Sequence, residues 1–236
     1  MGRVDLSKCT ALVTGANRGL GKKFVIELLR RGATVYAGAR NPDSIDVDGV
    51  TPLAIDVTDP ASVAAAAARA QDVTLLVNNA GMSNGTNLLT SDLADVRQEF
   101  DTNVFGVLTV TRAFAPVIEG NGGGAILNIL SVLSWVSMPL LGGYCASKAA
   151  AWSATNALRV ELADRGIHVT GLHVGLMETD MTEGMDAPKS DPADVAAQAL
   201  DGVASGAFEV VADDLSRRTQ AALSGGVAVL YPQLKQ

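Results

Sequence analysis

Residues 14–21 read Thr-Gly-Ala-Asn-Arg-Gly-Leu-Gly, with an apolar run at 9–13 before them and an amphipathic helical pattern at 22–31 after them. Glycines between a strand and a helix let the backbone approach a ligand closely. The N-terminus of the helix that follows offers N–H groups and the positive end of a dipole to a phosphate. The stretch therefore predicts a dinucleotide-binding turn, although its spacing is G-x-x-x-G-x-G. A plain strand-to-helix turn, the alternative, needs fewer glycines.

Strands alternate with helices along the rest of the chain. The patterns predict strands at 9–13, 33–38, 50–55, 73–77, 125–130, 167–174 and 208–211, and helices at 22–31, 60–70, 92–118, 144–163 and 191–205. This alternation is typical of an α/β fold. We expect a doubly wound, Rossmann-type parallel sheet of about seven strands with helices on both faces. Residues 1–236 are expected to form a single dinucleotide-binding and catalytic domain, with weak helical character at 213–224 and an ambiguous apolar tail at 225–232.

Composition excludes several classes of function. The formal net charge is -7 and no basic cluster is present, which argues against a nucleic-acid partner or an anionic membrane. Residues 120–147 carry no charge, but their glycines, asparagines and Pro139 are not those of a continuous membrane helix. Two cysteines form no disulfide framework, and residues 1–8 lack the apolar core of a signal peptide. We therefore expect a cytoplasmic protein, and no metal site is predicted.

The end of the second predicted strand indicates which nucleotide is bound. An acidic residue at this place usually holds the ribose hydroxyls of NAD. Here Ala39 and Arg40 follow the strand, and Arg18 lies in the glycine-rich turn. Two cations without a carboxylate predict a site for a 2′-phosphate, and therefore NADP(H). The alternative is that Arg40 is an ordinary surface residue.

Tyr144 and Lys148 lie four residues apart, so they share one face of the helix predicted over 144–163. A cation near a phenol favours the phenolate and lowers the pKa of the phenol, which suits a general acid or base near neutral pH. Ser131, at the end of the fifth predicted strand, is placed to hydrogen-bond the oxygen that receives the proton. Taken alone, the pair is also compatible with a surface tyrosine beside a solvated lysine.

Five motifs in a fixed order carry a family resemblance. They are Thr14-Gly15-x-x-x-Gly19-x-Gly21, Asn78-Asn79-Ala80-Gly81, Asn103, Ser131 and Tyr144-x-x-x-Lys148. Together they resemble the short-chain dehydrogenase/reductase family, in its compact single-domain branch, over nearly the whole chain. Val174-Gly175 departs from the usual Pro-Gly after the sixth strand, and Leu130 stands where a second serine is common. The segment between Thr179 and Asp191, which often covers the substrate, is short.

The resemblance implies a role for each matching residue. Tyr144 would be the general acid/base, Lys148 would lower its pKa and hold the nicotinamide ribose, and Ser131 would orient the substrate. Asn103 would position a proton-relaying water. The implied cofactor contacts are Gly15, Asn17, Arg18, Gly19, Leu20, Gly21, Arg40, Asp56, Val57, Asn79, Ala80, Gly81, Tyr144, Lys148, Met177 and Thr179.

The predicted activity is NADP(H)-dependent interconversion of a hydrophobic ketone or aldehyde and its alcohol, with Tyr144 as general acid/base. The expected pocket walls are mostly apolar: Ser83, Leu133, Trp135, Val136, Met138, Leu141, Met177 and Met181. Trp135 and the methionines are equally compatible with a core or interface role. A reductase of acyl-thioester ketones and a non-catalytic NADP(H)-binding sensor are the alternatives. By analogy with the family, we expect a homodimer or homotetramer formed through the helices near 92–118 and 144–163.

Overall fold

The computed structural model describes residues 4–234 and contains one seven-stranded parallel sheet. The strands are β1 (Thr10–Thr14), β2 (Thr34–Ala39), β3 (Thr51–Ala54), β4 (Leu75–Asn78), β5 (Gly124–Ile129), β6 (Ile167–His173) and β7 (Glu209–Val211). The α-helices are α1 (Gly19–Arg30), α2 (Pro60–Arg69), α3 (Leu93–Phe100), α4 (Val107–Gly120), α5 (Gly142–Leu162), α6 (Pro192–Ser205), α7 (Asp214–Ala222) and α8 (Val227–Leu230). The predicted doubly wound sheet is confirmed.

The strand order is β3-β2-β1-β4-β5-β6-β7, so the chain reverses its direction of winding at β1. All six neighbouring pairs are parallel. The carboxyl ends of all strands therefore meet at one edge of the sheet. In this fold, ligands bind at that edge, beside the point of reversal between β1 and β4.

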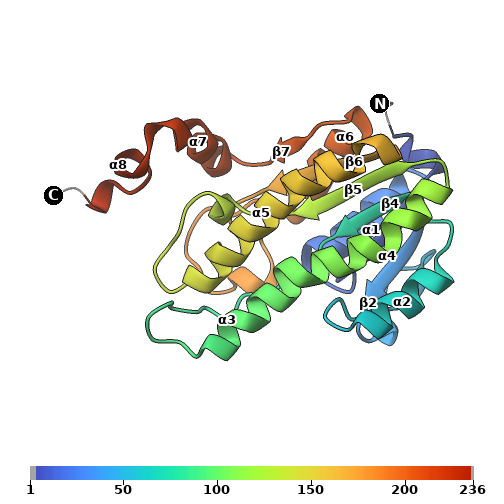
Figure 1. Cartoon of the computed structure of the whole chain (residues 1–236), viewed down its shortest axis with the longest axis horizontal. Helices are drawn as coiled ribbons and strands as arrows, with labels where there is room; N and C mark the ends of the chain where they lie inside the picture. Colours follow the sequence, from blue (N-terminus) through green and yellow to red (C-terminus); the bar gives the residue numbers. More distant parts are fainter. Residues whose placement is uncertain (1–3, 235–236) are drawn as a thin grey trace.

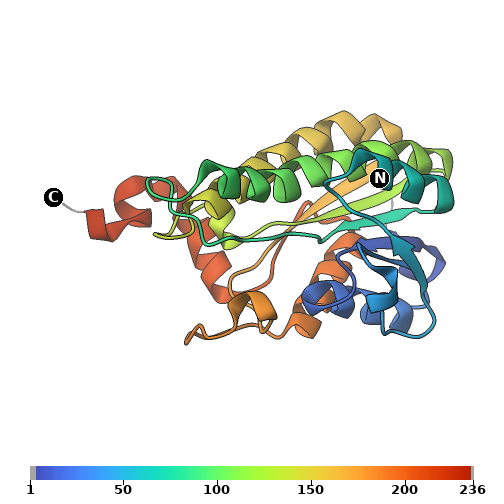
Figure 2. The ribbon, with the colours of Figure 1, turned by 90° about the horizontal axis from the view of Figure 1, so that it is seen from below.

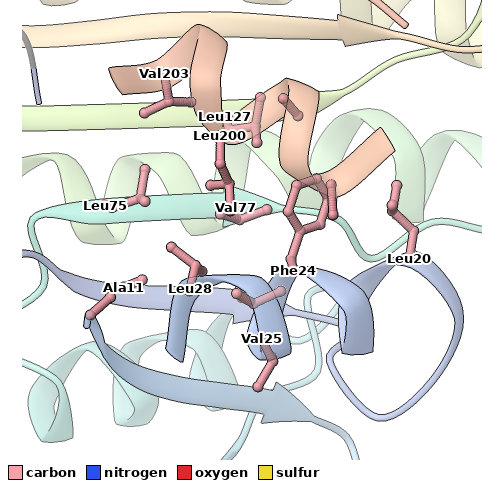
Figure 3. Close-up of a cluster of buried hydrophobic side chains, with 14 of the residues drawn as sticks. Ala11, Leu20, Phe24, Val25, Leu28, Leu75, Val77, Leu127, Leu200 and Val203 are labelled. Atoms are coloured by element: carbon pink, nitrogen blue, oxygen red, sulfur yellow. The ribbon is translucent and has the colours of Figure 1, made fainter. Parts of the chain in front are cut away.

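Helices cover both faces of the sheet (Figure 2). On one face α1 and α6 pack against β1, β4 and β5 through a cluster that includes Phe24, Leu28 and Leu200, each fully buried (Figure 3). On the other face α2, α4 and α5 pack through a second cluster that includes Phe114 and Leu158. Because both faces are covered, the central strands are apolar on both sides, which explains why they read as continuous apolar runs in the sequence.

The long helix predicted over 92–118 is interrupted. A π-helical turn, Asp101–Gly106 (η3), joins α3 to α4. Gly106 is required here because a Cβ at this position would lie 2.9 Å from Val57 Cγ2. The interruption places Asn103, which is buried, at the carboxyl edge of the sheet. No helix within residues 4–234 is long and apolar enough to cross a membrane.

The segment after β7 forms an arm that extends beyond the sheet (Figure 1). It contains α7, where the sequence pattern was weakly helical, and α8, where the pattern was ambiguous. The Tyr231 hydroxyl at its end accepts a hydrogen bond from the Ser137 N–H at 2.8 Å. The arm is thereby tied to the loop between Ser131 and Tyr144.

Candidate active site

The glycine-rich turn has the backbone that its sequence requires. Gly15 and Gly19 have φ angles of +63° and +51°, in the left-handed region that favours glycine. A Cβ at Gly21 would lie 2.1 Å from the Gly15 carbonyl oxygen, so only glycine fits there. The Arg18 side chain makes no capping hydrogen bond to α1 within the described chain. The N–H groups of the first turn of α1 are thus left for an anion.

Asn79 braces this turn from the end of β4. Its side-chain amide donates to the carbonyl oxygens of Thr14 at 2.9 Å and Gly15 at 3.1 Å. The Thr14 hydroxyl in return accepts from the backbone N–H groups of Asn79 and Ala80, each at 3.0 Å. The Asn79 side chain therefore supports the turn, and its predicted contact with the cofactor stays a prediction.

The loop after β6 lies across the same turn. The methyl group of Thr179 is 3.5 Å from the position that a Cβ at Gly19 would take. Arg18 forms an ion pair with Asp180, 3.1 Å apart, and both side chains are more than two-thirds exposed. Arg18 and Thr179, predicted as cofactor contacts from two distant stretches of the sequence, therefore lie close together at the start of α1.

The end of β2 carries the second predicted cation. Arg40 is exposed there, directly after the buried Ala39. The pKa of Asp56 is lowered, mainly by hydrogen bonds from Thr58 and in smaller part by the charge of Arg40. The charge of Arg40 thus acts on the Asp56 carboxylate, the residue after the buried Ile55.

The side chains of Ser131, Tyr144 and Lys148 lie together where β5 ends and α5 begins. Ser131 and Lys148 are 6% exposed. The Lys148 ammonium lies 5.7 Å from the centroid of the Tyr144 ring and donates to the Ile129 carbonyl at 2.8 Å. A hydrogen bond from the Ser131 side chain stabilises the Tyr144 phenolate. The three side chains form one compact group of hydroxyl, phenol and ammonium.

The prediction that the pKa of Tyr144 is lowered is wrong when only the groups of the protein act on the phenol. Burial raises the pKa of Tyr144 to about 12, and the Ser131 side chain offsets only part of this rise. Burial also lowers the pKa of Lys148 to about 8. In both cases the low-polarity surroundings disfavour the charged form. The phenol is therefore neutral at pH 7.

Asn103 is held by the π-helical turn and has fixed partners. Its side-chain N–H groups donate to the Met82 carbonyl and the Ser147 hydroxyl, each at 2.9 Å, and its oxygen accepts from the Met82 N–H at 3.0 Å. Ser147 donates in turn to the Tyr144 carbonyl at 2.8 Å. Asn103 thus connects the segment after β4 to the helix that carries Tyr144 and Lys148.

With this geometry in place, the comparisons identify the family. The model of the short chain dehydrogenase family matches residues 9–190. The chain belongs to the short-chain dehydrogenase/reductase family. The structure of a short chain dehydrogenase from Burkholderia cenocepacia J2315, in complex with NADP, has a TM-score of 0.93 to this one. It is 37% identical, with 98% of this chain and 99% of that chain covered.

Two curated relatives match this chain over most of their length. The uncharacterized oxidoreductase YbbO of Escherichia coli (strain K12) is 34% identical over 190 residues, 77% of this chain and 71% of YbbO. The NADP-dependent 3-hydroxy acid dehydrogenase of Schizosaccharomyces pombe (strain 972 / ATCC 24843) is 32% identical over 191 residues, 73% of each chain. The relatives thus place this member of the family among oxidoreductases.

Three buried polar residues of this short-chain dehydrogenase/reductase, Thr111, Asn128 and Thr155, were not singled out from the sequence; they form one chain of hydrogen bonds with Asn78 of the predicted motif. Asn78 donates to Thr111 at 3.1 Å and to Asn128 at 2.9 Å, and Asn128 donates to Thr155 at 3.0 Å. This chain of side chains crosses from α4 through β4 and β5 to α5. A polar residue inside a predicted buried strand, as at Asn128, was the available signal, since such a group must find a partner.

The remaining predicted residues divide between site and core. Leu20 and Val57 are buried, and Asn17, Ala80 and Met177 are partly buried along the same edge of the sheet. Trp135, offered as a pocket wall, packs into the core instead, stacked on His173 with ring centroids 3.8 Å apart. Met138 is 52% exposed, and the side chain of Met181 lies outside the described part of the chain.

Proposed function

We propose that this protein is an NADPH-dependent carbonyl reductase of hydrophobic ketones or aldehydes. One observation carries the proposal: a neutral phenol, a hydroxyl and an ammonium converge beside a glycine-rich turn built for a dinucleotide. The same residues serve alcohol oxidation in the reverse direction. The proposal makes Ser131, Tyr144 and Lys148 the catalytic residues.

The residues present fit a dinucleotide phosphate. A Cβ at Gly21 would clash with the Gly15 carbonyl oxygen, Gly15 and Gly19 have positive φ angles, and the first turn of α1 has no side-chain cap within the described chain. Arg18 and Arg40 supply positive charge on the adenosine side, which favours a 2′-phosphate over the free hydroxyls of NAD. The relative of known structure with NADP bound supports the same choice. When bound, the nicotinamide supplies the hydride.

The proton comes from Tyr144. Because burial holds the pKa of the phenol near 12, Tyr144 carries its proton throughout the neutral range. It can therefore give that proton to a carbonyl oxygen placed against it. Ser131, in contact with the phenol, binds the same oxygen and fixes the direction of transfer.

Lys148 and Asn103 support this pair. The Lys148 ammonium uses one hydrogen for Ile129 and keeps the others for a ribose hydroxyl at the same edge. Asn103, bonded to Ser147 in the first turns of α5, holds the helix that carries both Tyr144 and Lys148. The role expected for Asn103, positioning a water that relays protons to Lys148, stays part of the proposal beside this support.

The substrate class follows from the exposed apolar side chains of the loop between Ser131 and Tyr144. Met138 and Leu140 are 52% and 66% exposed there, and no charged residue lies between residues 120 and 147. Such a surface favours an uncharged, hydrophobic carbonyl compound. The fission-yeast relative is named for a hydroxy acid, so 3-oxo acids belong in the test as the competing class.

The test measures NADPH and NADH oxidation with aryl and aliphatic ketones, aldehydes and 3-oxo acids. We expect turnover with NADPH on the hydrophobic compounds. Tyr144→Phe should lower kcat by about 10²–10⁴-fold, the usual contribution of a general acid, while NADPH still binds. Arg40→Asp should raise the KM for NADPH and leave that for NADH unchanged or lower. Val160→Ala, at an exposed site near the C-terminal end of α5, is the matched control.

Each outcome decides a different part of the proposal. Turnover on 3-oxo acids alone would overturn the substrate class. Equal use of both cofactors by the wild-type protein would overturn the roles of Arg18 and Arg40. Tight NADPH binding without turnover on any compound would favour a sensor over an enzyme.

A further inference from the structure

His173 is a buried titratable residue that the proposed reaction does not use. It ends β6, beside the end of β5 that leads to Ser131, and it is 0% exposed. Its Nδ1 lies 3.2 Å from the Ser131 carbonyl oxygen. This contact joins a core imidazole to the backbone of a proposed catalytic residue.

We propose that His173 is a positioning residue, which holds Ser131 in place by a hydrogen bond from its Nδ1–H to the Ser131 carbonyl. The inference rests on the proposed function, since it concerns how one of the three catalytic side chains is oriented. It adds a residue from β6 that touches neither substrate nor cofactor.

The surroundings of the ring determine which nitrogen carries hydrogen. A carbonyl oxygen can only accept, so Nδ1 must be the donor. Nε2 has no hydrogen-bond partner among the described residues and lies 3.6 Å from Glu209 Oε1. Burial lowers the pKa of His173, which favours the neutral ring. The geometry thus corresponds to a neutral imidazole with its hydrogen on Nδ1.

The charge of Glu209 is balanced by other groups. Its Oε1 accepts from Trp152 Nε1 at 3.0 Å and lies 3.5 Å from the Arg159 guanidinium. Its Oε2 accepts from the Gln220 amide at 3.1 Å. The carboxylate therefore does not need a proton on His173 Nε2, and the imidazole remains available to Ser131.

Two tryptophans fix the orientation of the ring. Trp135, in the turn that follows Ser131, stacks on it with 3.8 Å between centroids and 15° between planes. Trp152, from α5, meets it edge-on at 6.3 Å. The imidazole is thus held between the Ser131 turn and the helix that carries Tyr144. A rotation of the ring away from Ser131 would break the stack on Trp135.

The hydrogen bond acts on a residue whose other groups are already bound. The Ser131 side chain accepts from the Leu133 N–H at 3.1 Å, and the Ser131 N–H donates to the Ser134 hydroxyl at 3.2 Å. The Ser131 carbonyl accepts from the Ser134 N–H at 3.0 Å, and His173 adds a second donor to the same oxygen. With both ends fixed, the Ser131 hydroxyl keeps one direction toward Tyr144, as a proton transfer between set positions requires.

The kinetic test separates the effect of losing the hydrogen-bond donor from the effect of losing the aromatic ring. His173→Phe keeps an aromatic ring against Trp135 but removes the donor, whereas His173→Asn keeps an N–H near the position of Nδ1 but removes the ring. We expect His173→Phe to lower kcat about 10-fold, the equivalent of one lost hydrogen bond, with the KM for NADPH unchanged. His173→Asn should recover most of that loss. His168→Phe, at the other end of the same strand, should keep the wild-type kcat.

Either of two kinetic results would overturn the proposal: full kcat in His173→Phe, or an equal or larger loss in His173→Asn, which would indicate packing alone. Nitrogen-15 NMR supplies a readout that needs no turnover, since the chain has 2 histidines and His168→Phe assigns them. A neutral Nδ1–H tautomer at pH 7 supports the proposal, and an Nε2–H tautomer overturns it. Absence of wild-type turnover would count against the proposed function and leave the tautomer result standing.

Discussion

The two helical layers of this protein cover one sheet but are packed by different chemistry. The layer of α1 and α6 meets the sheet through apolar side chains such as Phe24, Leu28 and Leu200. The layer of α4 and α5 combines an apolar cluster with buried polar residues, among them Asn128 and Lys148. Apolar contacts contribute stability without direction, whereas hydrogen bonds set distances and angles. The layer of α4 and α5 thus adds direction to apolar packing, and α5 carries Tyr144 and Lys148.

The largest expected effect lies in the apolar layer. Leu200→Ala removes a fully buried side chain from α6 and should lower the free energy of unfolding by about 3 kcal/mol, because a cavity remains. Urea unfolding measures this loss. The kcat of the folded variant should equal that of the wild type. A lowered kcat would show that the two layers are not separate in function.

A buried charge in the polar layer gives the next effect, of about 2 kcal/mol. The pKa of Lys148 falls from 10.5 in the unfolded chain to about 8 in the folded one. Below pH 8 both states are charged and burial costs stability; above it the folded protein releases the proton first. Stability should therefore rise between pH 8 and 10 by about 2 kcal/mol relative to Lys148→Met. Urea unfolding of both proteins at pH 8 and pH 10 tests this. An equal change in the free energy of unfolding of the two proteins between these pH values would contradict it.

A smaller effect is expected from the polar bridge between β4 and β5. Asn78→Ala and Asn128→Ala each break the 2.9 Å bond between these side chains. The double variant should lose less stability than the sum of the single variants, by about 1 kcal/mol, because the bond is lost only once. A double-mutant cycle from urea unfolding measures the difference. Strict additivity would mean that the bond contributes nothing.

Some elements of this protein have a local signal in the sequence, whereas others depend on contacts between distant residues. The strands and the glycine-rich turn were predicted because their signals are local: an apolar run, three glycines and a helical period. The π-helical turn at Asp101–Gly106 was missed because it leaves the apolar period of the helix nearly unchanged. The proposed role of His173 depends on the pairing of the preceding residue, Leu172, with Ile129 of β5, which no local pattern reveals.

The pKa of Tyr144 shows the same limit. The spacing to Lys148 correctly brought two side chains to one helix face. The sign of the shift depends on how deeply tertiary packing buries the phenol, and on the turn of the ammonium toward Ile129. Charge spacing along a helix predicts proximity, whereas burial decides which protonation state is favoured.

The smallest expected effect lies outside both layers. The ion pair between Arg18 and Asp180 is exposed, so Asp180→Asn should change the free energy of unfolding by less than about 0.5 kcal/mol. The same change releases the Arg18 guanidinium and should lower the KM for NADPH slightly. Urea unfolding and NADPH titration measure the two effects. A large loss of stability would show that the pair holds the loop after β6 in place.

β1 lies where the chain reverses its direction of winding, and this position has a consequence for synthesis of the chain. β2 and β3 add to one side of β1, and β4 to β7 then add to the other side in chain order. A nascent chain that ends before residue 75 therefore exposes the edge of β1, an open pairing surface on strands that are apolar on both faces. Ser131 and α5 reach the sheet only after that edge is closed. Synthesis thus supplies the strands beside the glycine-rich turn first and the segments that carry Ser131, Tyr144 and Lys148 later.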